Sequence, residues 1–303
     1  MATARSDADH DRTEGSTEWF DDHWQRSLEQ RRFLYPRAVP ATQWELFERE
    51  KARHIDLLLN DKRLSVGLVL ECGCGTAGMS IYLANHGYTA VAVDLSRKAL
   101  ALARLNTLEN SEGDAVSRVH LLEGDVLSLP FGDECCDVVM SHGLLEHFDP
   151  PSLRIVLGEM VRVLRPGGLF LADIAHGGFS VRKVARWLNL LVILVYYLCR
   201  GDTDKLRITW ASYFDGFYEN RLDPRQWTHE FELAGLADTE MKVMRPFPPL
   251  DLTPSVGKMY VAFMERSLRF WHWFDASQSW LSRKWGWLYL AHAAKPAQPS
   301  PPS

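Results

Sequence analysis

The stretch Leu68-Val69-Leu70-Glu71-Cys72-Gly73-Cys74-Gly75-Thr76-Ala77-Gly78 places a short apolar strand directly before a glycine-rich turn. Gly73 and Gly75 have no Cβ, so the backbone can bend sharply there and approach a ligand closely. A helix that follows such a turn directs its free N–H groups toward the same point. The pattern therefore predicts a binding site for a nucleotide-like ligand.

Two cofactors are compatible with these glycines. Gly73, Gly75 and Gly78 satisfy the G-x-G-x-x-G dinucleotide fingerprint, and Asp94 lies at a suitable distance downstream. Glu71, at the end of the strand, would repel a pyrophosphate but attract the ammonium group of a methionine moiety. The carboxylate therefore favours S-adenosylmethionine (SAM) over NAD. The competing interpretation is that Glu71 merely faces solvent at a strand end.

From Leu68 to Ile174 the chain resembles the class I SAM-dependent methyltransferases, in particular those that act on small molecules. The turn from Glu71 to Gly75 matches the E/D-x-G-x-G motif of that family. Further matches follow in the family's order: Tyr88 to Asp94, Gly124-Asp125-Val126, Ser141 to Phe148, and Val163-Leu164-Arg165-Pro166-Gly167-Gly168. The resemblance implies a Rossmann-like α/β fold, with a mostly parallel seven-stranded sheet and helices on both faces.

The resemblance also implies SAM as the cofactor and a role for each matched residue. Asp94 would accept hydrogen bonds from the two ribose hydroxyls, because both oxygens of a short carboxylate can be used at once. Leu95 would pack on the adenine, and Asp125 and Val126 would contact its exocyclic amine and its ring. Residues after the fourth strand would flank the methionine end. The predicted cofactor-binding residues are Glu71, Cys72, Gly73, Gly75, Asp94, Leu95, Asp125, Val126, Ser141 and His142.

The expected elements follow the family's order along the chain. They are a helix over Met79–Asn85, strands over Val119–Glu123, Cys136–Ser141 and Leu169–Ile174, a helix over Pro224–Leu233, a strand over Asp238–Arg245 and an antiparallel strand over Trp287–Ala294.

Five segments are expected. Residues 1–60 form a disordered start and an N-terminal helical cap, and residues 61–176 form the SAM-binding core. Residues 177–223 form a helical insertion after strand 5 that acts as a substrate lid. Residues 224–295 complete the core and hold a second helical insertion between strands 6 and 7, and residues 296–303 form a disordered tail. The aromatic residues between Trp19 and Asn60 suit a cap over the cofactor and, equally well, ordinary core packing.

The segment Trp187–Cys199 is almost continuously apolar, but its 13 residues are too few to span a bilayer, which needs about 20. Three interpretations remain open. The favoured one is a buried helix; the others are a homodimer contact and a surface that touches a membrane or an apolar substrate.

Composition restricts the class of protein. A chain of 303 residues with 46% apolar content suits one soluble enzyme, and a net charge of −5 without basic runs argues against nucleic-acid partners. The five cysteines lack zinc-site spacing, so we expect reduced structural thiols and no metal. The polar stretch Met1–Glu18 has no apolar core of a signal peptide, which predicts a cytoplasmic location.

Catalysis needs little from the protein, because the sulfonium of SAM is already activated and in-line positioning supplies much of the acceleration. His176 follows the fifth strand, three residues after Asp173, and is the first candidate for an acid/base or substrate-orienting role. The alternative interpretation is that His176 is an exposed loop histidine with no such role. His147 is a second candidate, although a role in capping or orienting the next helix suits it better.

The sequence predicts a SAM-dependent methyltransferase (EC 2.1.1) for a small, apolar or aromatic metabolite. The acceptor atom can be oxygen, nitrogen or carbon. Two alternatives remain open: a nicotinamide-dependent oxidoreductase that uses the same glycines, and a non-catalytic SAM-binding protein.

Overall fold

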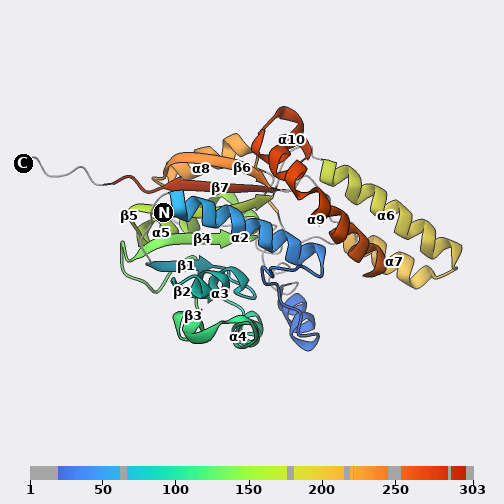
Figure 1. Cartoon of the computed structure of the whole chain (residues 1–303), viewed down its shortest axis with the longest axis horizontal. Helices are drawn as coiled ribbons and strands as arrows, with labels where there is room; N and C mark the ends of the chain where they lie inside the picture. Colours follow the sequence, from blue (N-terminus) through green and yellow to red (C-terminus); the bar gives the residue numbers. More distant parts are fainter. Residues whose placement is uncertain are drawn as a thin grey trace, which may run out of the picture.

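The computed structural model describes residues 20–61, 67–175, 181–214, 219–220, 222–244, 254–285 and 288–297 (Figure 1). Its centre is a seven-stranded sheet in the order β3-β2-β1-β4-β5-β7-β6. The strands are β1 (Leu68–Cys72), β2 (Thr89–Asp94), β3 (Val119–Glu123), β4 (Cys136–His142), β5 (Leu164–Ala175), β6 (Ala237–Met244) and β7 (Leu288–Ala294).

Strand β7 is antiparallel to both β5 and β6, whereas β1 to β5 are parallel. The predicted fold class is confirmed. Strand β1 lies between β2 and β4 in the sheet. The chain adds β2 and β3 on one side of β1 and then β4 and β5 on the other, so the strand order reverses at β1. Open α/β sheets bind ligands at the carboxyl ends of the strands beside such a reversal.

Helices lie on both faces of this sheet (Figure 1). They are α2 (Gln43–Asp61), α3 (Gly78–Asn85), α4 (Arg97–Asn110), α5 (Pro150–Val163), α6 (Val181–Cys199), α7 (Thr203–Phe214), α8 (Pro224–Leu233), α9 (Pro254–Ala276) and α10 (Trp280–Trp285). A further helix covers residues 20–29. Two 3₁₀ turns, η1 (Gly113–Arg118) and η2 (Leu145–His147), complete the described elements.

The central strands are buried on both faces, because alternate residues point to opposite sides of the sheet. Val69 and Met140 face α2, where Phe47, Ile55 and Leu58 pack on them. Leu70, Val139 and Phe170 face the other side, where α5 and α8 supply Leu157, Trp227 and Phe231. The strand ends that carry polar residues are thus held between two apolar layers.

Some boundaries differ from the sequence-based expectation for local reasons. Strand β5 begins at Leu164, not Leu169, because Leu164 already pairs with Cys136 before the turn at Gly167, where φ is +75°. Glu146 and His147 lie in the separate turn η2, which precedes α5. That helix begins after Asp149, whose carboxylate accepts a hydrogen bond from the Ser152 amide at 3.1 Å, with proline in the first turn.

The favoured interpretation of Trp187–Cys199 as a buried helix is wrong. The segment belongs to α6, which forms an antiparallel hairpin with α7 that projects from the body of the molecule (Figure 1). Leu190 is buried, but Leu188, Leu191 and Val192 are each more than half exposed. Within the described residues, no helix has the length and apolarity needed to cross a membrane.

Candidate functional site

The glycine turn after β1 is tightly enclosed by two other segments. Gly73 and Gly75 have φ values of +67° and +52°, a region that favours glycine. A Cβ on Gly73 would lie 2.7 Å from Leu144, next to η2, and a Cβ on Gly75 would lie 2.7 Å from the ring of Trp24. The backbone conformation therefore favours glycine at both positions, and a Cβ at either one would require the side chain of Leu144 or Trp24 to move.

Residues 20–35 are fixed across this turn by several polar contacts. The Leu34 amide donates to Thr76 Oγ1 at 3.3 Å, and Asn106 Nδ2 donates to the carbonyl oxygens of Leu34 at 3.1 Å and Thr76 at 2.7 Å. Phe20 contacts the ring of His147 edge to face, with 5.1 Å between centroids. The N-terminal segment thus covers the glycine turn and η2, as a cap would.

The carboxylate of Asp94, at the carboxyl end of β2, is held beside the glycine turn by two backbone hydrogen bonds. Its Oδ2 accepts a hydrogen bond from the Gly75 amide at 2.8 Å, and its Oδ1 accepts one from the Ser96 amide at 2.9 Å. A carboxylate has about four acceptor positions, so this carboxylate retains acceptor capacity for a ligand. Burial raises the pKa of Asp94, and the amides of Ser96 and Gly75 oppose that shift.

Glu71 is 3% exposed, so the alternative that it faces solvent at a strand end is wrong. One carboxylate oxygen accepts hydrogen bonds from the Ser80 hydroxyl at 2.5 Å and from the Ser80 amide at 3.1 Å. Burial raises the pKa of Glu71, whereas His142 and the Ser80 hydrogen bonds act in the opposite direction. Cys72 beside it is fully buried, and burial raises the pKa of its thiol.

The end of β4 carries buried polar atoms that the described residues leave unsatisfied. Ser141 is fully buried and its Oγ has no hydrogen-bond partner within the described part of the chain. Both ring nitrogens of His142 also lack a hydrogen bond there, although Nδ1 lies 3.4 Å from Asp173 Oδ2 on β5. Buried polar groups normally have partners, so these atoms suit a polar ligand.

Lys51 is a residue of this region that the sequence analysis missed. Its Nζ lies 2.7 Å from Asp173 Oδ2 and 3.2 Å from Glu48 Oε1, and the side chains of Lys51 and Asp173 are each 5% exposed. Asp173 Oδ1 also accepts a hydrogen bond from the Gly143 amide at 2.5 Å. A buried ion pair thus ties α2 to the carboxyl ends of β4 and β5.

A sequence signal for Lys51 exists in retrospect. Phe47, Lys51, Ile55 and Leu58 are spaced by three or four residues, so they share one face of α2. That face packs on the sheet. A lysine inside a core-facing apolar stripe needs a buried acidic partner, although the sequence does not say which one.

The remaining predicted residues surround this region or lie outside it. Leu95, after β2, is 64% exposed, and Val126 is buried. Asp125 is exposed, and its Oδ1 accepts a hydrogen bond from the Leu127 amide at 2.9 Å. His147 lies in η2 against Phe20. His176 lies outside the described residues.

These residues fit the SAM suggested by the sequence. Asp94 has acceptor positions beyond its two amide bonds, and Leu95 exposes an apolar side chain next to it. Unsatisfied polar atoms gather at the end of β4, the neighbouring strand of β1. Within the described residues, no group of three or more His, Cys, Asp or Glu side chains could hold a metal ion.

Comparison with known proteins agrees with this geometry. Residues 70–172 match the family described as a methyltransferase domain. A malonyl-[acyl-carrier protein] O-methyltransferase from Pectobacterium atrosepticum is 40% identical over 123 residues, which are 40% of this chain and 44% of that protein. A sterol 24-C-methyltransferase from Gibberella zeae is 29% identical over 156 residues, which are 51% of this chain and 38% of that protein.

A solved structure of a SAM-dependent methyltransferase from Thermotoga maritima has a TM-score of 0.50 at 15% identity, and the match covers 92% of this chain and 97% of that one. At this identity the likeness shows the fold alone. The chain matches less than half of the length of the two curated relatives.

The matched region is therefore a class I SAM-dependent methyltransferase domain. SAM is the cofactor of this class, which decides between the two ligands that the glycines alone left open. The assignment of individual residues to SAM stays a prediction.

A Gly75→Ala variant is expected to bind S-adenosylhomocysteine at least tenfold more weakly. Alanine in this left-handed conformation raises the conformational energy of the turn by about 1–2 kcal/mol, and its methyl group would collide with the ring of Trp24. Gly113→Ala is the matched control, because φ there is +56° and no atom lies within 4 Å of the added Cβ. Calorimetric titration should show unchanged affinity for the control and partial recovery when Trp24→Ala is added to Gly75→Ala. Equal affinities of Gly75→Ala and wild type would contradict the role of the close contact.

Proposed function

We propose that this protein is a SAM-dependent methyltransferase that transfers a methyl group to a small, apolar or aromatic metabolite. The observation that carries the proposal is the position of the Asp94 carboxylate at the end of β2. It accepts hydrogen bonds from the amides of Gly75 in the glycine turn, at 2.8 Å, and of Ser96, at 2.9 Å. These bonds fix a carboxylate with free acceptor positions beside the turn. This arrangement suits the two hydroxyls of a ribose and lies within the matched methyltransferase domain.

The class of acceptor is supported by two independent features. The relatives named above are a malonyl-[acyl-carrier protein] O-methyltransferase and a sterol 24-C-methyltransferase, so their acceptors are an acyl group on a carrier and a sterol. In addition, the elements that follow β5 and β6 expose Trp, Phe and Leu side chains. Both relatives named above act on acceptors other than nucleic acids, and the sterol relative and the exposed apolar side chains favour an apolar acceptor. Insertions of this kind set substrate choice on a shared fold.

SAM supplies the activated methyl group, which leaves its sulfur as the acceptor atom forms the new bond. The protein must then hold the acceptor in line and, where the acceptor carries a proton, take that proton up. His176 and His147 are the candidates from sequence, and His142 joins them because Asp173 lies 3.4 Å from its Nδ1. The lid role of residues 177–223 also stays a prediction.

The proposal is tested by incubating the purified protein with SAM labelled on its methyl group and with a cell extract. The extract is then partitioned between organic and aqueous phases. We expect label in the organic phase, and on the order of tenfold less label with an Asp94→Ala variant when the SAM concentration is below the wild-type Kd. Label confined to the aqueous phase would contradict an apolar acceptor. Bound SAM with no transfer to any fraction would favour the alternative of a non-catalytic SAM-binding protein.

A further inference from the structure

Helix α6 exposes a continuous apolar surface. Six side chains on it are between 42% and 69% exposed: Val184, Leu188, Leu191, Val192, Val195 and Leu198. We call this set the α6 face. Their spacing places them along one side of the helix. In a helix packed on a core that side is the buried one, so an exposed apolar side of this extent indicates an interaction surface.

The α6 face is also flanked by aromatic and basic residues. No charged residue occurs between Trp187 and Cys199, and Arg186 and Arg200 stand immediately before and after this stretch. Trp187 and Tyr196 are 57% and 52% exposed. Exposed Trp and Tyr with apolar neighbours and terminal basic residues are typical of helices that lie in the interface of a membrane.

The charge of the projecting helices is opposite to that of the whole chain. Residues 181–214 hold six basic and two acidic residues, and residues 254–285 hold five basic and two acidic ones. These two segments therefore carry +4 and +3 at neutral pH. Since the chain as a whole carries −5, the other residues must carry −12. Such a distribution orients the molecule, hairpin first, toward an anionic surface.

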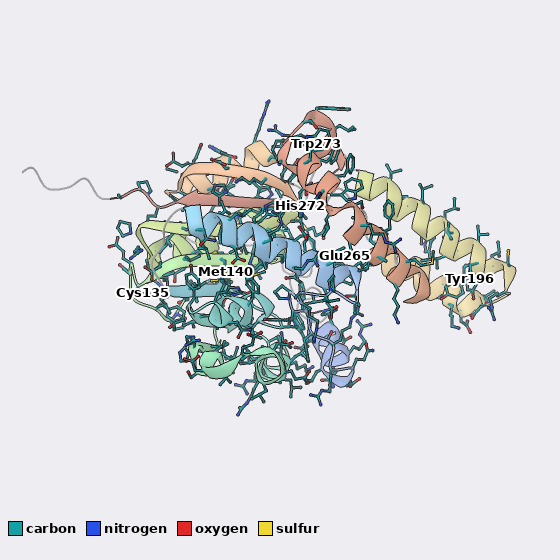
Figure 2. The ribbon with its side chains drawn as sticks, viewed as in Figure 1. Cys135, Met140, Tyr196, Glu265, His272 and Trp273 are labelled. Atoms are coloured by element: carbon teal, nitrogen blue, oxygen red, sulfur yellow. The ribbon has the colours of Figure 1, made fainter. Side chains whose placement is uncertain are left out.

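We propose that the α6 face docks on the surface of an anionic lipid bilayer. The helix lies in the interface and does not cross it, which agrees with the lack of any described helix fit to span a membrane. The far end of the hairpin, near Tyr196, projects away from the sheet, and Cys135 lies at the opposite end of the molecule (Figure 2). Docking through the hairpin therefore leaves the body of the domain in water.

A second copy of the chain is a less suitable occupant. Two α6 faces brought together would place two segments of charge +4 against each other, and like charges that face each other across an interface cost free energy. A bilayer that contains anionic lipids instead compensates this charge. The inference concerns docking alone and does not require that the protein transfers methyl groups.

The test is flotation of the purified protein with phosphatidylcholine vesicles, with and without phosphatidylglycerol. We expect binding that requires phosphatidylglycerol and decreases as salt increases. A Leu191→Glu/Val195→Glu variant should bind on the order of tenfold to a hundredfold more weakly, because carboxylates replace two apolar side chains that would enter the bilayer interface. The matched control is Leu108→Glu/Ile155→Glu, whose positions are 67% and 53% exposed in α4 and α5; it should bind like wild type.

A second measurement does not depend on the charged variants. Cys135 and Cys199 are exposed, and Cys72, Cys74 and Cys136 are buried with raised thiol pKa values because of their burial. A polarity-sensitive fluorophore therefore reacts selectively with Cys199 in a Cys135→Ser protein, and with Cys135 in a Cys199→Ser protein. On addition of anionic vesicles, we expect a blue shift at Cys199, at the end of α6, and none at Cys135.

Several outcomes would overturn the proposal. They are no binding to either vesicle, equal binding to both, wild-type binding by the Leu191→Glu/Val195→Glu protein, and a blue shift at Cys135 alone. A doubled mass in solution that this variant reduces to that of a monomer would instead assign the α6 face to a second copy. Unchanged S-adenosylhomocysteine binding by the variant shows that it has folded.

Discussion

A Lys51→Met variant is expected to lose about 3–5 kcal/mol of unfolding free energy, the usual cost of removing one partner of a buried ion pair. Lys51 and Asp173 are each 5% exposed at the side chain, with 2.7 Å between Nζ and Oδ2. Methionine fills a similar volume but leaves the Asp173 charge in a buried site. Urea unfolding of both proteins, followed by tryptophan fluorescence, measures the difference.

A double-mutant cycle separates the ion pair from simple packing. Asp173→Asn removes the charge and keeps the shape, so Lys51→Met combined with Asp173→Asn should regain much of the stability that Lys51→Met loses. Lys98→Met is the control, because Lys98 pairs with Asp21 at 2.9 Å on the surface, with side chains 36% and 55% exposed. That change should cost about 0–1 kcal/mol. If Lys51→Met lowered the unfolding free energy by as little as Lys98→Met, the expected contribution of the buried Lys51–Asp173 ion pair would be contradicted.

The pH dependence of this difference follows from the two pKa shifts. Burial alone would lower the pKa of Lys51 and raise that of Asp173, but the opposite charges outweigh it, so the pKa of Lys51 is raised and that of Asp173 is lowered. The Asp173 contribution is therefore present above its unfolded pKa of about 3.9 and is lost as the pH falls toward its lower folded value. The Lys51 contribution is present below about pH 10.4 and is lost at higher pH.

We thus expect a constant difference between wild type and Lys51→Met from about pH 5 to pH 9, and a smaller difference toward pH 2. Unfolding curves across this range measure it. A difference that grows on acidification would show that another group carries the effect.

The glycine turn and the sheet were predictable from sequence because their signals are local. Gly73 and Gly75 mark positive φ within a few residues of a strand, and Asp94 ends the next strand. Asp149 and Asp223 cap the helices that follow them, as their positions before proline indicate. Such features need only neighbouring residues, so a single sequence contains them.

Features that depend on tertiary partners were not predictable in the same way. The contact of Trp24 with Gly75 and the pairing of Lys51 with Asp173 join segments that lie far apart in the chain. The α6 segment shows the same limit, because an apolar run has the same sequence whether it is covered by the core or faces outward. Burial depends on what lies opposite, and for α6 the described structure places nothing on most of that face.

An Asp94→Ala variant is expected to bind S-adenosylhomocysteine about tenfold to a hundredfold more weakly, equivalent to about 1–3 kcal/mol. The loss has two sources. Alanine removes the acceptors offered to a ribose, and it also frees the amides of Gly75 and Ser96, which Asp94 now holds. Asp94→Asn should be intermediate, because its carbonyl oxygen can replace only one of the two oxygens. Isothermal titration calorimetry gives all three affinities.

Asp223→Ala is the matched control for this experiment. The Asp223 carboxylate also accepts hydrogen bonds from two backbone amides, those of Arg225 at 2.8 Å and Gln226 at 3.0 Å, but it caps α8 and not the turn. Its loss should cost about 1 kcal/mol of stability and leave the affinity unchanged.

Because burial raises the pKa of Asp94, wild-type affinity should start to fall on acidification at a higher pH than an exposed aspartate would give. Wild-type affinity in Asp94→Ala would remove Asp94 from the site.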